Sequence, residues 1–136
     1  MKIEGGCYCG AVRYVAEGEP LEKAQCHCRE CQYLSGGHPN VIMGMPKAGF
    51  AYTKGVPKQF RRTDLKTPRT REFCSECGTH LLTRSPSKPA GVNIKVGTFD
   101  DPSIFGGPEV VIQTADMQTF HHLPDGVPSF ERFPVK

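Results

Sequence analysis

The amino-acid sequence predicts a mainly β protein made of short antiparallel strands, with little helix. Short alternations of apolar and polar residues, separated by turn residues, run through most of the chain. The 15 glycines and 12 prolines among 136 residues disfavour long helices. Apolar residues make up only 38% and Trp is absent, so the core should be thin and gain stability from metals or disulfides. The length fits a single domain, residues 1–136.

Strand character recurs at short intervals between residues 11 and 112. The clearest strand is 92–96, where Val92, Ile94 and Val96 alternate with two polar residues. Turn residues at 18–20 and 100–102 separate such segments. The predicted strands cover residues 11–17, 21–26, 41–45, 59–63, 70–73, 92–96 and 110–112, and one more begins at Leu81 and Leu82.

Little of the chain is suited to helix. Residues 28–34 are the only stretch expected to form a helical turn or two. The tail, residues 123–136, carries three prolines and is expected to be an ordered loop laid over the sheet.

The N-terminus lacks the apolar run of a signal peptide, and no apolar stretch reaches the length of a membrane span. We therefore expect a cytoplasmic protein without a membrane partner. In the reducing cytosol, closely spaced cysteines are more often metal ligands than disulfides. The chain has seven cysteines, an odd number, so they cannot all pair within one chain.

The cysteines fall into three groups with metal-ligand spacing. They are the C-x-C-G group of Cys7 and Cys9, the C-x-C-x-x-C group of Cys26, Cys28 and Cys31, and the C-x-x-C-G group of Cys74 and Cys77. A C-x-x-C turn brings two sulfurs to about the separation that a tetrahedral zinc needs. Gly10 and Gly78 follow the second cysteine of their groups, where a left-handed residue lets backbone N–H groups face the sulfurs.

Seven sulfurs divide naturally into four and three. The two groups that end in Cys-Gly make a plausible closed structural zinc site from Cys7, Cys9, Cys74 and Cys77. Cys26, Cys28 and Cys31 then hold a second zinc, whose open fourth position is typical of a catalytic site. Two zinc ions per chain are expected.

Other interpretations of the second group remain open at this stage. A histidine (His27, His38 or His80) or an aspartate would close it into another structural site. A redox role for Cys74 and Cys77 is less well supported, because no thioredoxin-like βαβ pattern surrounds them.

The net charge does not favour nucleic-acid binding. The chain carries +3, and seven thiolates with two zinc ions would bring it close to neutral. A basic stretch between Lys54 and Arg71 leaves a non-enzymatic zinc module for protein or nucleic acid as the alternative to an enzyme. Nucleic acid is an unlikely partner, because Phe60 is one of few aromatics there.

Three segments resemble one known family. Residues 6–14 (GCYCGAVRY), 26–31 (CHCREC) and 73–81 (FCSECGTHL) look like the glutathione-dependent formaldehyde-activating enzymes, a family that includes the centromere protein V type of domain. Residues 96–102 (VGTFDDP) and 123–130 (LPDGVPSF) resemble its later segments, so the likeness spans nearly the whole chain.

The resemblance implies a fold of small sheets around zinc sites, called a β-tent. It implies a structural zinc on Cys7, Cys9, Cys74 and Cys77 and a catalytic zinc on Cys26, Cys28 and Cys31. It also implies carbon–sulfur lyase chemistry, the reversible addition of the glutathione thiol to formaldehyde to give S-hydroxymethylglutathione.

One segment departs from the family. Members often carry a Trp in a segment like S-x-x-W shortly before the final loop, where this chain has residues 119–122 (TFHH). If that aromatic shapes the substrate pocket, the substrate differs here.

Charge and proximity suggest further roles. His27 or His38 would move the proton, and Arg29, Arg61 or Arg62 would anchor the carboxylates of glutathione. We expect His121 and His122 to be an exposed loop pair rather than pocket residues.

Overall fold

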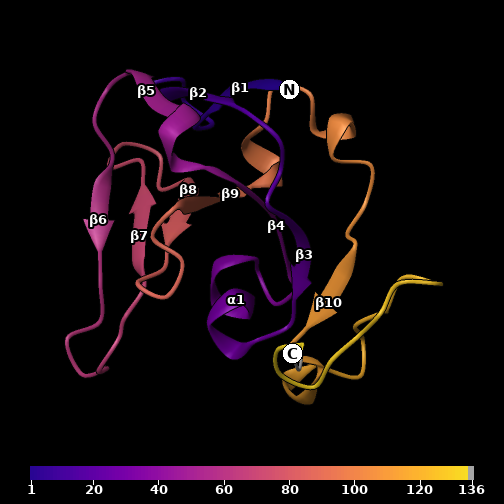
Figure 1. Ribbon diagram of the computed structural model, residues 1–136. Coiled ribbons are helices and arrows are strands. Elements are labelled where there is room, and N and C mark those ends of the chain that lie inside the picture. The colour runs from indigo at the N-terminus through magenta and orange to yellow at the C-terminus, as the bar shows by residue number, and fades with distance from the viewer. Residues whose placement is uncertain (135–136) are drawn as a thin grey trace.

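The computed structural model describes residues 1–134 and confirms a mainly β fold with little helix. The described residues form ten strands in two sheets, with one α-helix and short 3-10 turns (Figure 1). The strands are β1 (Lys2–Gly6), β2 (Arg13–Glu17), β3 (Glu22–Cys26), β4 (Asn40–Pro46), β5 (Phe50–Lys54), β6 (Lys58–Phe60), β7 (Thr70–Phe73), β8 (His80–Arg84), β9 (Gly91–Lys95) and β10 (Val110–Ile112). The helix is α1 (Arg29–Leu34), and the 3-10 turns are η1 (Lys47–Gly49), η2 (Val96–Thr98), η3 (Pro102–Phe105) and η4 (Thr114–Asp116).

The two sheets have the strand orders β1-β2-β5 and β10-β3-β4-β9-β8-β7-β6. Within residues 1–134 the named strands pair antiparallel except at one edge, where β10 runs parallel to β3, with Ile112 opposite Cys26. The expectation of antiparallel strands is therefore wrong at this edge. Parallel neighbouring strands are joined by a long connection. The residues of β10 alone do not indicate in which direction this strand pairs with β3.

Every predicted strand is present, within a few residues of its expected bounds, but two strands were not predicted. β1 has a single large apolar side chain, Ile3, and ends in two glycines, so it lacks an alternating pattern. Its glycines have a packing role, since a Cβ on Gly5 would lie 2.3 Å from the carbonyl oxygen of Thr98. β5 follows η1 directly and pairs with β2, which a local pattern does not reveal.

The hydrophobic core lies between the two sheets. Ile3 and Tyr14 from the small sheet pack in one cluster with Met43, Leu82 and Ile94 from the large sheet. Each of these side chains is at most 1% exposed. One face of the large sheet is thereby covered by the small sheet.

The other face of the large sheet curves around α1. Figure 1 shows α1 between the arm with β6 and β7 and the arm with β3 and β10. Cross-strand pairs Cys26–Asn40 and Thr83–Asn93 lie on this face. The helix therefore faces a concave surface that carries polar residues and cysteine.

The tail runs along the edge strand β10. The Val111 N–H donates to the carbonyl of Pro128, and the Phe130 N–H donates to the carbonyl of Val111, both at 2.9 Å. The expected ordered loop is thus paired with the edge strand at residues 128–130. Residues 135–136 lie outside the described residues.

Candidate metal centres

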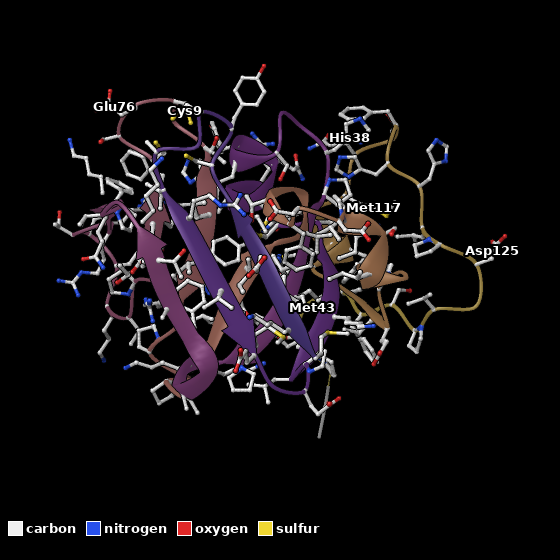
Figure 2. All side chains as sticks on the ribbon, turned by 90° about the horizontal axis from the view of Figure 1, so that it is seen from above. Cys9, His38, Met43, Glu76, Met117 and Asp125 are labelled. Carbon is white, nitrogen blue, oxygen red and sulfur yellow. The ribbon has the colours of Figure 1, made fainter. Side chains whose placement is uncertain are left out.

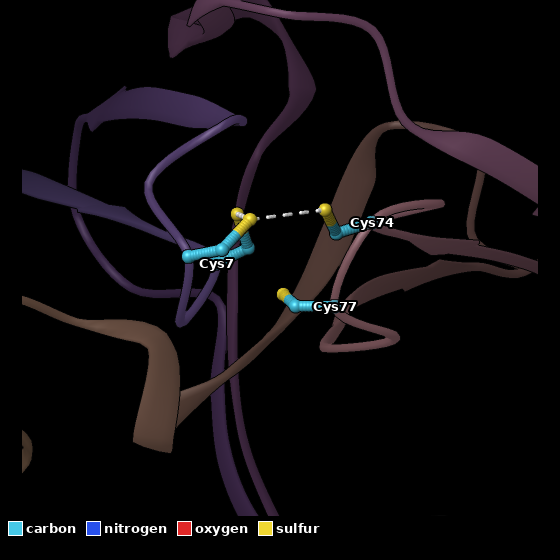
Figure 3. Close-up of side chains that lie close together, drawn as sticks. Cys7, Cys74 and Cys77 are labelled. Atoms are coloured by element: carbon cyan, nitrogen blue, oxygen red, sulfur yellow. Dashed lines mark hydrogen bonds between the residues drawn. The ribbon is translucent and has the colours of Figure 1, made fainter.

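The first cysteine cluster joins two loops that are distant in the sequence. Cys7 and Cys9 lie between β1 and β2, and Cys74 and Cys77 lie in the turn between β7 and β8. Their four sulfur atoms lie within 4.8 Å of one another. The Cys7–Cys9 and Cys9–Cys74 sulfur pairs are 3.6 Å and 3.7 Å apart, close to the separation of about 3.8 Å in a tetrahedral zinc–thiolate site. Figure 3 shows Cys7, Cys74 and Cys77 converging from the two loops.

Both loops have the backbone that their glycines predict. Gly10 and Gly78 have φ of +80° and +77°, a left-handed conformation that favours glycine. The Gly78 N–H donates to the Cys74 carbonyl at 2.8 Å, which closes the turn. The Cys7 sulfur then accepts from the Val12 N–H at 3.2 Å, and the Cys74 sulfur accepts from the Glu76 N–H at 3.4 Å. These bonds stabilise thiolates.

A thiolate is already favoured at one position of this cluster. The pKa of Cys77 is lowered to about 5, first of all because the Thr79 hydroxyl, 3.1 Å away, bonds to the sulfur. Four thiolates so close together would repel one another strongly without a cation. A soft divalent cation such as zinc removes that repulsion, so the donor set fits the metal.

The second cluster is local in sequence. Cys26 ends β3, Cys28 is the N-cap of α1, and Cys31 lies in the first turn of that helix. The three sulfurs lie within 4.8 Å of one another. The Cys28 sulfur accepts from the Cys31 N–H at 3.3 Å, and the Cys31 sulfur accepts from the Asn40 amide at 3.7 Å. The hydrogen bond that caps α1 therefore orients the Cys28 sulfur, which faces the sulfurs of Cys26 and Cys31.

The charge in this cluster is shared among the sulfurs. The pKa of Cys28 is lowered to about 2, because Cys26 and then Cys31 donate to its sulfur, with a smaller contribution from the charge of Arg71. The pKa of Cys26 is raised in turn by its bond to Cys28. Burial lowers the pKa of Lys95 to about 8, although the nearby Cys31 opposes that change. The cluster thus carries negative charge close to the buried Lys95 and the half-buried Arg71.

A cavity of about 360 Å³ adjoins these three cysteines. It is bounded by the concave face of the large sheet, by α1 and by the tail. In the described part of the chain, its cationic lining residues are Arg69, Arg71 and Lys88. Among residues 1–134, no histidine nitrogen, carboxylate oxygen or further cysteine sulfur lies within 4.8 Å of all three sulfurs. A metal held there would have protein ligands on one side and the cavity on the other.

Proton transfer or metal ligation by a histidine was expected at the three-cysteine cluster, but none of His27, His38 and His80 lines its cavity. His27 is fully buried and its Nδ1 lies 3.0 Å from the Nδ1 of His121, while its Nε2 is 3.0 Å from the Gln25 amide. His38 packs against Phe120 and His121 instead of lining the cysteine cavity. Figure 2 shows His38 well away from Cys9, on the side of Met117.

The expectation of an exposed His121–His122 pair is wrong for one member. His122 is exposed, but His121 is only 5% exposed, because it bonds the Gly37 carbonyl at 2.7 Å and contacts His27. Those partners come from distant segments, so the local sequence gave no signal of its burial.

The arginines also differ from expectation. Arg29 and Arg62 line a neighbouring cavity rather than the cysteine cavity, and Arg61 lines neither. The sequence did not indicate that Arg69 and Arg71 line the cysteine cavity. The alternation in β7 could have indicated Arg71, which lies opposite Thr83 on the concave face.

Comparison with known proteins decides the family. The family model described as "glutathione-dependent formaldehyde-activating enzyme" matches residues 2–116. The chain belongs to this family. A Halomonas elongata relative, provisionally named as such an enzyme, is 32% identical over an alignment of 105 residues, and the match covers 74% of this chain and 67% of the relative.

A solved structure supports the fold of this family member. A Rhodobacter sphaeroides protein superposes with a TM-score of 0.61 at 19% identity, covering 78% of this chain and 97% of that one. In the described part of the chain, no helix is long and apolar enough to cross a membrane.

Proposed function

We propose that this single domain is a zinc-dependent, carbon–sulfur lyase-like enzyme acting on a small thiol adduct such as S-hydroxymethylglutathione. The three-cysteine cluster carries the proposal, because it adjoins a cavity with three cationic residues and has no fourth protein ligand among residues 1–134. The family name supports glutathione and formaldehyde as reactants. A cytoplasmic location is part of the proposal, because closely spaced cysteines serve as metal ligands more often in the reducing cytosol.

The two clusters take different roles in this proposal. Cys7, Cys9, Cys74 and Cys77 hold a structural zinc, since four thiolates close its coordination shell. Cys26, Cys28 and Cys31 hold a reactive zinc and leave one position for substrate. Bound there, zinc lowers the pKa of a thiol and polarises an oxygen.

The reaction itself involves no oxidation. In the addition direction a sulfur–carbon bond forms, the carbonyl becomes an alcohol, and the thiol proton ends on its oxygen. Arg69, Arg71 and Lys88 are placed to bind the carboxylates of glutathione. Lys95, buried near the sulfurs, offsets negative charge on the cluster.

Thiol binding to the cobalt-substituted protein tests the proposal. Thiolate–cobalt charge-transfer bands change when another sulfur coordinates the metal. Glutathione and cysteine should change the spectrum, whereas S-methylglutathione should not, and the response should be lost in Cys28→Ser. No response to either thiol would contradict the proposed site.

A second candidate is a non-enzymatic zinc module, favoured by the exposed basic residues between β5 and β7. Lys58, Arg61 and Lys66 are exposed there. Part of the charge is neutralised, because Arg62 pairs with Asp64 at 2.5 Å and Arg71 with Glu30 at 2.6 Å. This candidate predicts an unreactive cobalt site and a protein or nucleic-acid ligand.

A further inference from the structure

A second cavity lies beside the one at the three-cysteine cluster. It has a volume of about 480 Å³ and is formed by α1, β6, β7 and the loop between these strands. Its apolar wall includes Tyr33, Phe60, Leu65 and Phe73. We call it the aromatic cavity.

The aromatic cavity and the cysteine cavity share a wall. Glu30, Arg69 and Arg71 line both. The Arg71–Glu30 ion pair, 2.6 Å long, is part of this shared boundary. A molecule in the aromatic cavity therefore lies next to the space in front of Cys26, Cys28 and Cys31.

The charge of the aromatic cavity favours an anion. Within residues 1–134, four arginines and a single carboxylate, that of Glu30, line it. Arg62 and Arg71 have acidic partners, but Arg69 forms no ion pair within residues 1–134. Arg29 lies 5.0 Å from the ring centre of Tyr33 and donates to Gln32, so its charge is not neutralised by a carboxylate.

The apolar residues of this cavity are unusually accessible. Tyr33, Phe60 and Leu65 are 79%, 55% and 42% exposed. They belong to neither of the two buried core clusters, so the core does not account for them. Apolar surface that gathers beside unpaired cations is typical of a site for an amphipathic ligand.

We propose that the aromatic cavity binds an apolar carboxylate, an aryl or alkyl group that ends in a carboxyl group, as part of the carbonyl component of the substrate. The link to catalysis rests on the proposed function. Formaldehyde has one carbon and would leave this cavity empty. The substrate we infer is therefore the thiol adduct of a larger aldehyde that also carries a carboxyl group. The bond changes are those given above: a sulfur–carbon bond forms and the thiol proton moves to the carbonyl oxygen.

Equilibrium binding tests the cavity without any reaction. The probes are 4-phenylbutanoate, butanoate, which lacks the ring, and 4-phenylbutan-1-ol, which lacks the charge, each titrated calorimetrically and by NMR into the zinc-loaded protein. The phenyl acid should bind about tenfold or more tightly than butanoate, because its ring removes apolar surface from water. The alcohol should also bind more weakly than the phenyl acid, since it cannot pair with arginine.

Two matched variants locate the binding. Leu65→Asp places a negative charge in the aromatic cavity and should weaken 4-phenylbutanoate binding about tenfold or more. Leu21→Asp makes the same change at an exposed leucine, 60% accessible, that lies outside this cavity, and should leave binding unchanged. No saturable binding at millimolar concentration, or equal effects of the two variants, would overturn the proposal.

The outcome is separable from that of the proposed function. The Cys28→Ser variant should still bind 4-phenylbutanoate, although it should not bind thiols. In turnover with glutathione, Leu65→Asp should raise KM for an aryl aldehyde that carries a carboxylate by a larger factor than KM for formaldehyde. Equal changes in both KM values would overturn the link between the cavity and the carbonyl component.

Discussion

The two cysteine clusters differ in what they join. Cys9 and Cys74 are 65 residues apart in the chain, yet their sulfurs lie 3.7 Å from each other. One loop follows β1 of the small sheet, and the other connects β7 and β8 of the large sheet. Cys26, Cys28 and Cys31 instead occupy one strand end and one helix turn.

This difference indicates different consequences of metal loss. A metal that closes a long loop between two sheets stabilises the whole fold, because it opposes the entropy of the unfolded chain. A metal held by six consecutive residues closes almost no loop. Its position beside a cavity suits exchange of a ligand instead.

The largest expected effect comes from Cys74→Ser. Binding of a structural zinc contributes about 10 kcal/mol or more of folding free energy, comparable to the whole stability of a small domain. We expect this variant to be unfolded in thermal melts followed by circular dichroism. Cys28→Ser should remain folded, because serine is also a good N-cap for α1.

The pair of variants tests the comparison directly. A Cys28→Ala variant removes the cap as well, and should lose about 1 kcal/mol more than Cys28→Ser. If Cys74→Ser and Cys28→Ser lost equal stability, both clusters would be structural and the zinc-module candidate would gain support.

Metal removal gives the second-largest effect. The reduced protein is expected to contain two zinc ions per chain, and the zinc of the four-cysteine cluster should resist chelators longer, because it has four thiolate ligands. Elemental analysis of a protein lacking Cys26, Cys28 and Cys31 should find one zinc. Freshly purified protein without zinc would contradict both proposed sites.

The cysteine groups could be found from the sequence because their spacing is local. A C-x-x-C turn sets the separation of its sulfurs by itself, and the positive φ of Gly10 and Gly78 follows from the same turn. The alternating strand around Ile94 was equally evident. These features depend on a few neighbouring residues.

The features that sequence reasoning missed depend on tertiary contacts. β1 is a strand because Ile3 packs in the core and its backbone pairs with β2, although its own pattern is poor. His121 is buried by His27 and Gly37, which are more than 80 residues away. The same reason applies to Arg71 in the cysteine cavity, whose position follows from the pairing of β7 with β8.

The third prediction concerns the support of one sulfur. Asn40 is only 7% exposed and donates to the Cys31 sulfur at 3.7 Å. Loss of such an outer contact lowers metal affinity by about tenfold or more. Asn40→Ala should therefore weaken metal binding at the three-cysteine cluster in competition with a chelator, and leave the four-cysteine cluster unchanged.

Asn93→Ala is the matched control for this prediction. Asn93 lines the same cavity and is half-buried, but no hydrogen bond joins its side chain to a sulfur within residues 1–134. Equal weakening by both variants would show that the cavity wall, rather than the bond to Cys31, controls affinity.

The smallest expected effect comes from Gly78→Ala in the loop of the four-cysteine cluster. A Cβ on Gly78 meets no atom within 4 Å, so the substitution acts through the backbone alone. With φ at +77°, alanine is strained by roughly 1 kcal/mol.

Gly126→Ala provides the control, because Gly126 has φ of +74°, is equally unobstructed and lies in the tail, far along the chain from both clusters. Both variants should lose similar stability in denaturant melts. Only Gly78→Ala should release zinc faster to a chelator, because its turn holds Cys74 and Cys77 at bonding distance. Faster release in both variants would mean that global opening, and not this turn, limits the loss of metal.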